Sequence, residues 1–313
     1  MSKIGLSSRL CLLTLMTAIL SSCHYKDFDE YDRRENVPVR FVMGWTGMEQ
    51  QPGMRLVIYP EEGQFLKPMI RDFNDSINIR LPEGRYSVVA FNSYSDILRI
   101  SGIDDDQRMI RISTGMADLT KTRSLDSLKT QPLYDYPDTL TTARDSAVVI
   151  DWEKFQSFEG VQRVVLKPFV ATKAVSVIVE GIKHLEYVHS AVFCLTDCYT
   201  AYFPVQNILD NILGTVVSAN SKYDCQNNKL YNNFNVFGFK AEYPHTLYII
   251  LTGEGFCKIL PFDLDSSNIN VDEQGNITIR LTSDFDVKSV VPKGNTFDID
   301  IGEWKADSTQ IDL

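Results

Sequence analysis

The sequence predicts an all-β protein that consists of two tandem β-sandwich domains. Three observations favour this fold class. Apolar and polar residues alternate with a period of two in many segments, turn-forming residues follow most of these segments, and only one short stretch has the pattern of a helix. Short strands joined by turns are typical of sandwiches and not of a doubly wound α/β fold.

The predicted strands of the first half begin where a charged segment ends. The first of them places Val37, Val39, Phe41, Met43 and Trp45 on one face. The alternation resumes after the turns at residues 51–53 and 82–84, so we expect hairpins of a sheet with one covered face. These later strands contain Met54, Leu56 and Ile58, then Ile77, Ile79 and Leu81, and then residues 86–91.

A polar stretch separates the two halves. Residues 115–144 are rich in Thr, Ser, Asp, Lys and Pro, and we expect a boundary near residues 160–164. This gives an N-terminal domain at residues 37–160 and a C-terminal domain at residues 161–313, each of ordinary domain size. The second half has predicted strands at residues 164–166, 175–179, 190–202, 235–239, 247–252, 258–262, 277–281 and 297–301, and a predicted short helix at residues 205–213.

The first 22 residues have the pattern of a signal peptide. Lys3 and Arg9 precede an apolar run at residues 10–20, which is too short to span a bilayer. The run ends in Leu20-Ser21-Ser22-Cys23, which resembles the lipobox of bacterial lipoproteins. We therefore expect a lipoprotein signal peptide at residues 1–22, acyl chains such as palmitate on Cys23, and a lipidated tether at residues 23–36. An ordinary secretory signal with an accidental cysteine is the alternative.

The charged tether carries a second indication of location. His24 follows the cysteine, so the aspartate of the familiar inner-membrane retention signal is absent. Lys26 followed by Asp27 and Asp29 resembles the signal that exports some lipoproteins to the outer face of the outer membrane, although a solvated tether is the alternative. We expect a lipid-anchored protein of the outer membrane, exposed at the cell surface.

The charge balance argues against a nucleic-acid partner. The chain of 313 residues has 31 basic and 41 acidic side chains, a formal net charge of −10. Removal of the signal peptide takes away Lys3 and Arg9 and no acid, so the net side-chain charge becomes −12. Phosphate neutralisation requires clustered Lys and Arg, which this balance does not favour.

Four cysteines remain after Cys11 leaves with the signal peptide and Cys23 takes the lipid: Cys194, Cys198, Cys225 and Cys257. Buried free thiols, one disulfide, and a metal site completed by His184 and His189 are the three alternatives. In an extended strand Cys194 and Cys198 would share a face, about 13 Å apart at ~3.3 Å per residue, which is too far for a disulfide between them.

No catalytic or cofactor motif is present in the sequence. There is no nucleophile elbow, no zinc-protease helix motif and no phosphate-binding loop, so we expect no enzyme activity, no cofactor and no metal. Gly253-Glu254-Gly255 and Asp272-Glu273-Gln274-Gly275-Asn276 have the composition of turns, and Asp104-Asp105-Asp106 that of a solvated loop. The histidines are interpreted as surface or hairpin residues. Carbohydrate binding is the alternative function, because sugars stack on exposed aromatic rings. Trp152 is one of the aromatic residues that such a platform would include.

Several motifs together resemble the fimbrillin-like lipoproteins, the superfamily of type V pilus subunits and their minor or anchor relatives. They are the lipobox, Val37-Pro38-Val39-Arg40-Phe41 after the charged tether, Leu81-Pro82-Glu83-Gly84-Arg85-Tyr86 before residues 88–92, and Leu166-Lys167-Pro168-Phe169 at the start of the second half. The resemblance covers most of the mature chain. It implies two tandem sandwiches of the immunoglobulin-like or transthyretin-like kind, and Cys23 is the single functional residue that it transfers.

The resemblance also implies a non-enzymatic role in cell adhesion, as a pilus anchor or accessory subunit that joins other subunits by β-strand complementation. Stalk subunits of that family lose their first strand to an Arg-directed protease, whereas anchor relatives keep it. Arg40 lies inside the first predicted strand, and Arg33-Arg34 lie before it. Donation from the C-terminus would use residues 296–301, because residues 305–313 are polar. A surface carbohydrate-binding lipoprotein of a nutrient-uptake system is the alternative.

A modification is indicated by four tripeptides, which resemble the Asp-Ser/Thr-apolar acceptor of O-glycosylation: Asp75-Ser76-Ile77, Asp126-Ser127-Leu128, Asp138-Thr139-Leu140 and Asp145-Ser146-Ala147. The tripeptide is permissive, so chance matches are the alternative.

Overall fold

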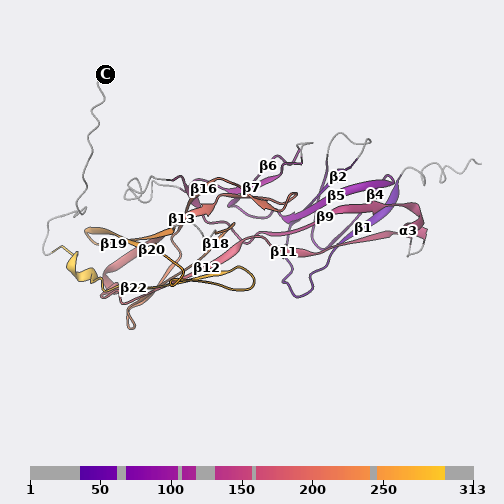
Figure 1. Ribbon diagram of the computed structural model, residues 1–313. Coiled ribbons are helices and arrows are strands. Elements are labelled where there is room, and N and C mark those ends of the chain that lie inside the picture. Colours follow the sequence, from indigo (N-terminus) through magenta and orange to yellow (C-terminus); the bar gives the residue numbers. More distant parts are fainter. Residues whose placement is uncertain are drawn as a thin grey trace, which may run out of the picture.

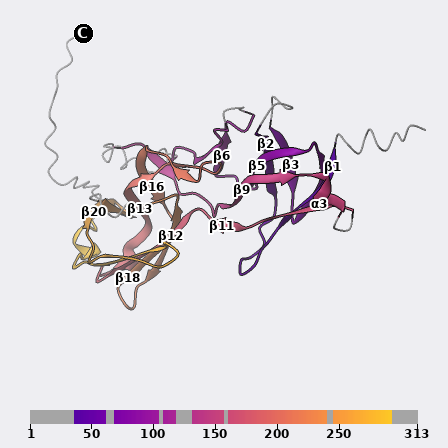
Figure 2. The same cartoon turned by 45° about the vertical axis from the view of Figure 1, so that its right-hand side comes forward.

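The computed structural model describes residues 36–61, 68–104, 108–117, 131–156, 160–239 and 245–292. Over these residues the protein is all-β, as predicted, with its sheets arranged along one long axis (Figures 1 and 2). β1 (Val37–Met43) lies near one end of the molecule, and β22 (Ile277–Thr282) lies near the other.

The remaining elements of the first half follow in chain order. They are β2 (Met54–Pro60), β3 (Met69–Phe73), β4 (Ser76–Leu81), β5 (Gly84–Asn92), β6 (Leu98–Ser101), β7 (Arg111–Thr114), β8 (Leu133–Asp135), β9 (Thr141–Ile150), the short helix α3 (Trp152–Gln156), β10 (Gln162–Leu166) and β11 (Pro168–Val170).

The elements of the second half are mostly longer strands. They are β12 (Lys173–Glu180), the 3-10 helix η3 (Leu185–Tyr187), β13 (Val188–Tyr199), β14 (Ala201–Phe203), β15 (Ile208–Leu209), β16 (Leu213–Ser218), β17 (Ser221–Asp224), β18 (Lys229–Val236), β19 (His245–Gly253), β20 (Phe256–Leu264), β21 (Ile269–Val271), β22 and the 3-10 helix η4 (Val287–Ser289).

The first half consists of three layers. A five-stranded sheet, β11-β9-β5-β2-β3, lies between the three-stranded sheet β10-β1-β4 and the four-stranded sheet β15-β14-β7-β6. Leu56 packs toward Phe41 of β1, whereas the next residue, Val57, packs in the opposite cluster with Tyr202 of β14. The prediction of one covered face is therefore wrong for this sheet, because β2 and β5 are buried on both faces.

The second half is a two-layer sandwich. The sheet β17-β18-β12-β22-β21 packs on the sheet β20-β19-β13-β16-β8. Alternate residues of β12, Val175, Val177 and Val179, point into the core that these sheets enclose, together with Phe193 and Ile249. The alternation predicted from the sequence therefore identifies the core residues of this strand. Burial of a side chain of this size stabilises the fold by about 1.5–3 kcal/mol.

Strands are exchanged between the two halves. β8 lies parallel to β16 with Leu133 opposite Thr215, and β14 lies antiparallel to β7 with Ala201 opposite Ser113. β10 and β11 follow residue 160, yet they pair with β1 and β9. The division into domains at residues 37–160 and 161–313 stays a prediction, and these pairings favour a division after Val170 over one near residues 160–164.

Gly214 allows β8 to approach β16. A methyl group added at Gly214 would lie 2.6 Å from the ring of Tyr134 in β8 and 3.0 Å from Thr200. Valine at this position forces the strands apart, so we expect Gly214→Val to lower the free energy of unfolding by about 1–3 kcal/mol. Gly115→Val is the matched control, because a Cβ atom there would meet the flexible side chain of Arg99 at 3.0 Å. Urea unfolding of both variants measures the effect, and equal loss would contradict this account.

The helix predicted at residues 205–213 is wrong. Those residues turn at Asn207, which has a φ of 59° and donates its backbone N–H to the carbonyl of Phe203. Ile208 and Leu209 then pair with β14 as β15. Asn tolerates the left-handed conformation, and the Asn207 carboxamide oxygen accepts a hydrogen bond from the Tyr202 hydroxyl at 2.5 Å. This turn and its pairing with β14 override a weak helical pattern.

Candidate functional site: the first strand and its neighbours

β1 is the central strand of its sheet and is fully integrated in the fold. It pairs in parallel with β10, where Phe41 lies opposite Val164, and antiparallel with β4, where Phe41 lies opposite Ile77. Val37, Val39 and Phe41 are 0% exposed. Because both edges of β1 are paired and its inner face fills the core, the strand is not available for exchange without opening this layer of the first half.

Arg40 presents its side chain to solvent, as its place in the alternation predicts. Its Nη2 donates a hydrogen bond to Oγ of Ser76 at 3.3 Å. The backbone at Arg40 lies between Arg163 of β10 and Asn78 of β4. A protease binds its substrate as an extended segment, so cleavage after Arg40 would require β1 to leave both partners.

The turn between β4 and β5 holds the N-terminal end of β1 in place. Tyr86 donates a hydrogen bond from its hydroxyl to the carbonyl of Pro82 at 2.8 Å, and Glu83 Oε1 accepts one from the backbone N–H of Trp152 at 2.9 Å. Leu81 lies opposite Val37. The Leu-Pro-x-Gly-x-Tyr segment therefore connects three elements, β1, β5 and α3, which gives its residues a structural role.

Burial raises the pKa of Tyr86 to about 12. A hydroxyl that is harder to ionise in the folded state than in the unfolded state, where the pKa is about 10, stabilises the fold below pH 10. That contribution is lost as the pH rises from about 10 to about 12. The pKa of Tyr202 is also raised to about 12 by burial. Both tyrosines therefore make the stability fall over the same pH range.

We expect Tyr86→Phe to cost about 1 kcal/mol near neutral pH, from the lost hydrogen bond to Pro82. The same variant should lose less stability than the parent chain between about pH 10 and about pH 12, because one of the two perturbed hydroxyls is gone. Urea unfolding at both ends of this range measures it. Tyr94→Phe is the control, since Tyr94 is 85% exposed, and an unchanged alkaline slope in Tyr86→Phe would contradict the assignment.

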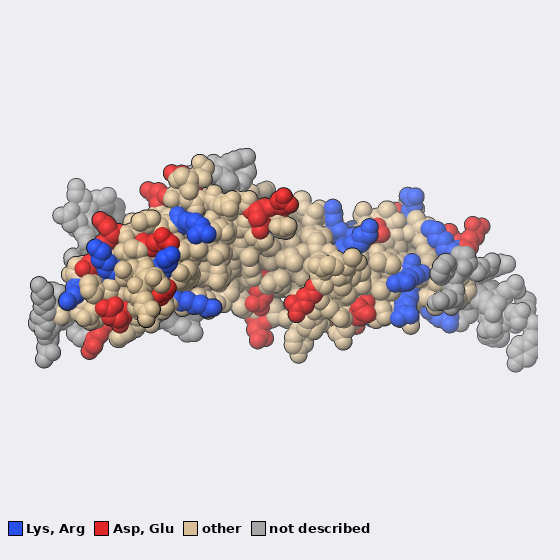
Figure 3. Space-filling model, turned by 90° about the horizontal axis from the view of Figure 1, so that it is seen from below, with Lys and Arg blue, Asp and Glu red and all other residues tan. Residues whose placement is uncertain are grey.

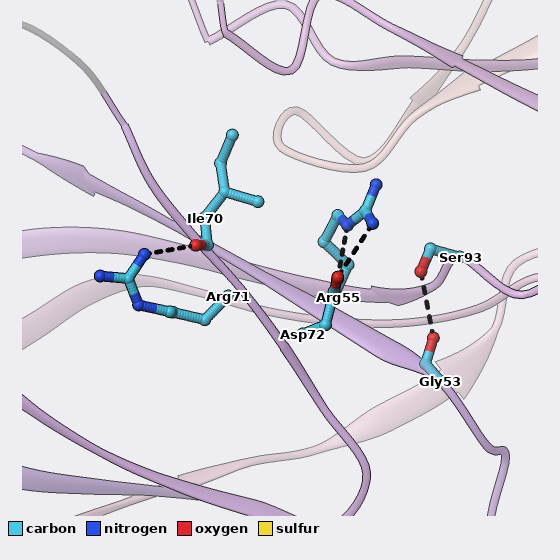
Figure 4. Close-up of polar contacts among 6 residues, drawn as sticks. All are labelled: Gly53, Arg55, Ile70, Arg71, Asp72 and Ser93. Carbon is cyan, nitrogen blue, oxygen red and sulfur yellow. Dashed lines mark hydrogen bonds and ion pairs between the residues drawn. The ribbon is translucent and has the colours of Figure 1, made fainter.

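An ion pair holds the edge strand β3 against β2. Arg55 donates from Nε to Oδ1 of Asp72 at 2.7 Å and from Nη2 to Oδ2 at 3.1 Å, as Figure 4 shows. The guanidinium lowers the pKa of Asp72. Next to this pair, the hydroxyl of Ser93 donates to the carbonyl of Gly53 at 3.2 Å, which ties β5 to β2. Charged residues on an exposed edge strand oppose pairing with another chain.

The four cysteines after the tether are free thiols, of which Cys194 and Cys198 are buried, Cys257 is half-buried and Cys225 is exposed. The prediction that Cys194 and Cys198 share a face is wrong. The register of β13 shifts between Leu195 and Cys198, with Asp197 at a φ of 58°. This bulge turns Cys198 into the core between the sheets and leaves Cys194 on the outer face. Burial raises the pKa of Cys194 to about 12.

Among the described residues, His184 and His189 do not complete a metal site with the cysteines. His184 donates or accepts through Nδ1 with Asp286 at 2.8 Å, and η3 separates it from the exposed His189. The expectation of a surface position is wrong for His245, which is 2% exposed and stacks on Phe239 with ring centroids 3.8 Å apart. In the part of the chain that the structure describes, no three His, Cys, Asp or Glu residues gather as metal ligands.

Within the described ranges, the tryptophans that indicated a sugar platform do not form an exposed aromatic surface. Trp45 packs against the β1 core and donates from Nε1 to Asp75 at 3.1 Å. Trp152 packs against the same core and meets Phe155 edge-on at 4.7 Å. Tyr94 and Tyr187 are the aromatic side chains among the exposed large apolar residues of the described ranges.

The two predicted turns of the second half are confirmed. Gly253 pairs with Phe256 in the β19–β20 hairpin, and Gly255 has a φ of 73°. Asp272 accepts hydrogen bonds from the backbone N–H groups of Gln274 and Asn276 at 2.9 and 2.7 Å. Its carboxylate closes the turn, as an Asx turn does.

Several predicted residues lie outside the described ranges: Cys23 and the tether up to Glu35, Arg33-Arg34, Asp105-Asp106, Asp126-Ser127-Leu128, residues 296–301 and Trp304. Of the predicted acceptors of O-glycosylation inside them, Thr139 and Ser146 are exposed and Ser76 is half-buried. Their modification stays a prediction. Over the described residues, no helix has the length and apolar character that crossing a bilayer requires.

Comparison with known proteins assigns the chain to a family. The family described as Domain of unknown function (DUF5119) matches residues 22–217. A protein of Bacteroides ovatus with the provisional name fimbrium anchoring subunit Fim4B is 29% identical over 204 residues, which are 62% of this chain and 56% of that protein. The match thus spans about half the length of this relative.

Two solved structures share the fold. A protein of Bacteroides ovatus provisionally named an adhesin superposes with a TM-score of 0.58 at 19% identity, over 83% of this chain and 98% of its own. The fimbrial anchor protein Mfa2 of Porphyromonas gingivalis superposes with a TM-score of 0.50 at 16% identity, over 79% and 90%. The resemblance to the fimbrillin-like superfamily that the sequence motifs indicated is thereby confirmed, and the chain belongs to the family described as DUF5119.

Proposed function

We propose that this protein is a non-enzymatic outer-membrane lipoprotein that acts in cell adhesion, as the anchor or an accessory subunit of a pilus. The names of the similar proteins support a pilus-associated role. The lipobox at Cys23 supports lipid anchoring, and Lys26 followed by Asp27 and Asp29 supports exposure at the cell surface. Other pilus subunits are the expected partners.

The observation that carries the proposal is the position of β1. In strand complementation, a segment of one subunit fills a groove in the sheet of the next. Here β1 fills the place between β10 and β4 itself, with Val39 paired on both sides. A chain that keeps this strand has no vacancy for a donor strand there. It is therefore suited to the end of a filament, where it gives a strand and receives none.

The segment offered to the next subunit is residues 296–301, in which Phe297, Ile299 and Ile301 alternate with acids. The described residues end at Pro292, shortly after η4. η4 and β1 lie toward opposite ends of the long molecule in Figure 1. The last described residues thus lie far from the start of β1, which supports a role as an anchor between a membrane and a filament.

Deletion of residues 296–313 tests the proposal. We expect the cells to release filaments, or to yield fewer co-purified subunits, while the thermal unfolding of the first half stays unchanged. Deletion of residues 305–313 is the matched control, because it removes only the polar tail and leaves Phe297, Ile299 and Ile301 in place. Unchanged assembly after the longer deletion would contradict the donor role.

A further inference from the structure

The outer face of the sheet β10-β1-β4 is basic. Side chains that point away from the core alternate with the buried ones, and the register of the three strands brings the outward residues together: Pro38, Arg40 and Val42 of β1, Ser76, Asn78 and Arg80 of β4, and Arg163 and Val165 of β10. Three of them are exposed arginines and none is an acid. We call this set the arginine face.

Two of the arginines are direct neighbours. Arg40 and Arg163 are register partners across the parallel pair β1–β10, and Arg80 lies opposite Pro38 on the other side of β1. Like charges directly opposite one another destabilise a sheet. Within the described ranges, neither Arg40 nor Arg163 forms an ion pair with a carboxylate. Asp75 and Glu83 lie beyond the two ends of β4, where they bond Trp45 and the backbone of Trp152.

The outer sheet of the second half shows the opposite arrangement. Glu180 of β12 pairs with Lys229 of β18 at 2.8 Å, and its pKa is lowered by Lys229 and also by Arg280 of β22. There the cations surround an acid of the same face. For Arg40 and Arg163 the described residues of the arginine face supply no acid, which indicates that the compensating negative charge of these two arginines comes from outside the described fold.

The position of the arginine face indicates where that charge lies. β1 begins at Val37, directly after the tether, and residues 24–36 span at most roughly 45 Å when extended. The face is therefore confined to the neighbourhood of any lipid on Cys23. Figure 3, seen from below Figure 1, shows several Lys and Arg side chains close together over the end of the molecule that contains the N-terminal half, and others mixed with acids over the opposite end.

We propose that the arginine face binds the phosphate groups of an anionic membrane surface and thereby lays the first half of the protein on the bilayer to which it is anchored. Guanidinium groups bind phosphate oxygens in a bidentate manner. Val42 and the 46% exposed Val165 lie on the same face, next to Arg40 and Arg163, and provide apolar contact with the lipid. The proposal rests on the lipid anchoring given above, because the tether is what holds this face near a membrane.

Binding of the unlipidated chain, residues 24–313, to vesicles tests the proposal without any pilus subunit. We expect flotation with vesicles of phosphatidylcholine and phosphatidylglycerol, no flotation with pure phosphatidylcholine, and release by salt. Each arginine near an anionic surface contributes about fivefold to binding, so Arg40→Gln, Arg80→Gln and Arg163→Gln together should weaken it on the order of 100-fold. Circular dichroism shows whether the variant is folded.

The matched control is Lys183→Gln, Lys222→Gln and Lys288→Gln, which removes the same charge from exposed positions in the second half. It should bind as the parent chain does. Equal weakening by the control, or no weakening by the arginine variant, would overturn the proposal. So would binding that appears only when the chain starts at residue 36, since the acidic tether would then be the partner of this face. None of these results bears on donor-strand assembly, which the deletion of residues 296–313 tests separately.

Discussion

Replacing Phe41 by alanine is expected to destabilise the protein by about 3–5 kcal/mol and to expose the chain to cleavage after Arg40. Phe41 is 0% exposed and lies at the centre of β1, opposite Val164 and Ile77. Its removal leaves a cavity between two sheets and loosens the strand that fills the groove. The free energy of unfolding comes from urea titration, and the cleavage rate from digestion with an Arg-specific protease.

Val42→Ala is the control for this prediction, because Val42 is the next residue of the same strand and points outward. We expect it to cost well under 1.5 kcal/mol, as surface changes generally do. If Phe41→Ala left both stability and the cleavage rate at the level of Val42→Ala, β1 would be a dispensable strand. The chain would then be able to lose it as a stalk subunit does, and the anchor proposal would fail.

Replacing Cys23 by serine is expected to move the protein from the membrane fraction to the soluble fraction when the cells are fractionated in high salt. Each buried CH₂ group of an acyl chain stabilises membrane attachment by about 0.8 kcal/mol, so several chains make it effectively permanent. The arginine face alone gives attachment that salt reverses. Fractionation of cells in low and high salt, with detection of the protein in each fraction, measures the change.

Cys225→Ser is the matched control, since Cys225 is an exposed thiol far along the chain. It should leave the protein in the membrane fraction at either salt concentration. Membrane attachment of Cys23→Ser that survives high salt would contradict lipid anchoring. An intact mass equal to that of the unmodified chain from residue 23 onward would contradict it as well.

Much of the fold was predictable from local pattern, because one buried face gives a strand a period of two. β1, β12 and the β19–β20 hairpin follow this rule. Where both faces are covered the rule fails, as in Leu56-Val57-Ile58-Tyr59 of β2, which is a continuous apolar run. Such runs indicate a sheet between two layers, and the run in β2 was a signal of the third layer.

The exchange of strands between the halves could not be predicted from the sequence, because it depends on pairing between strands that are far apart in the chain. β8 is three residues long and meets β16 about eighty residues later, without a pattern of its own. The bulge at Asp197 is equally hidden, because one extra residue reverses the faces of Cys194 and Cys198 without changing the composition. Gly214 and Gly238 were the sequence signals of close packing, because a Cβ atom at either position would clash with a side chain from a neighbouring strand.

The candidate site was predicted in part. The alternation at Val37, Val39 and Phe41 indicated a strand that belongs to the fold, and the structure places it at the centre of its sheet. The arginine face needed the register, since Arg40 and Arg163 are far apart in sequence and become neighbours only when β10 pairs in parallel with β1.

We propose above all that this chain ends a strand-complemented filament at the outer membrane. Mass spectrometry of what co-purifies with the lipid-anchored protein, after gentle solubilisation of the outer membrane, tests it most directly. We expect a ladder of other sandwich subunits that stays together until boiled. A porin-like uptake receptor in their place would contradict the claim and would favour a carbohydrate-uptake role.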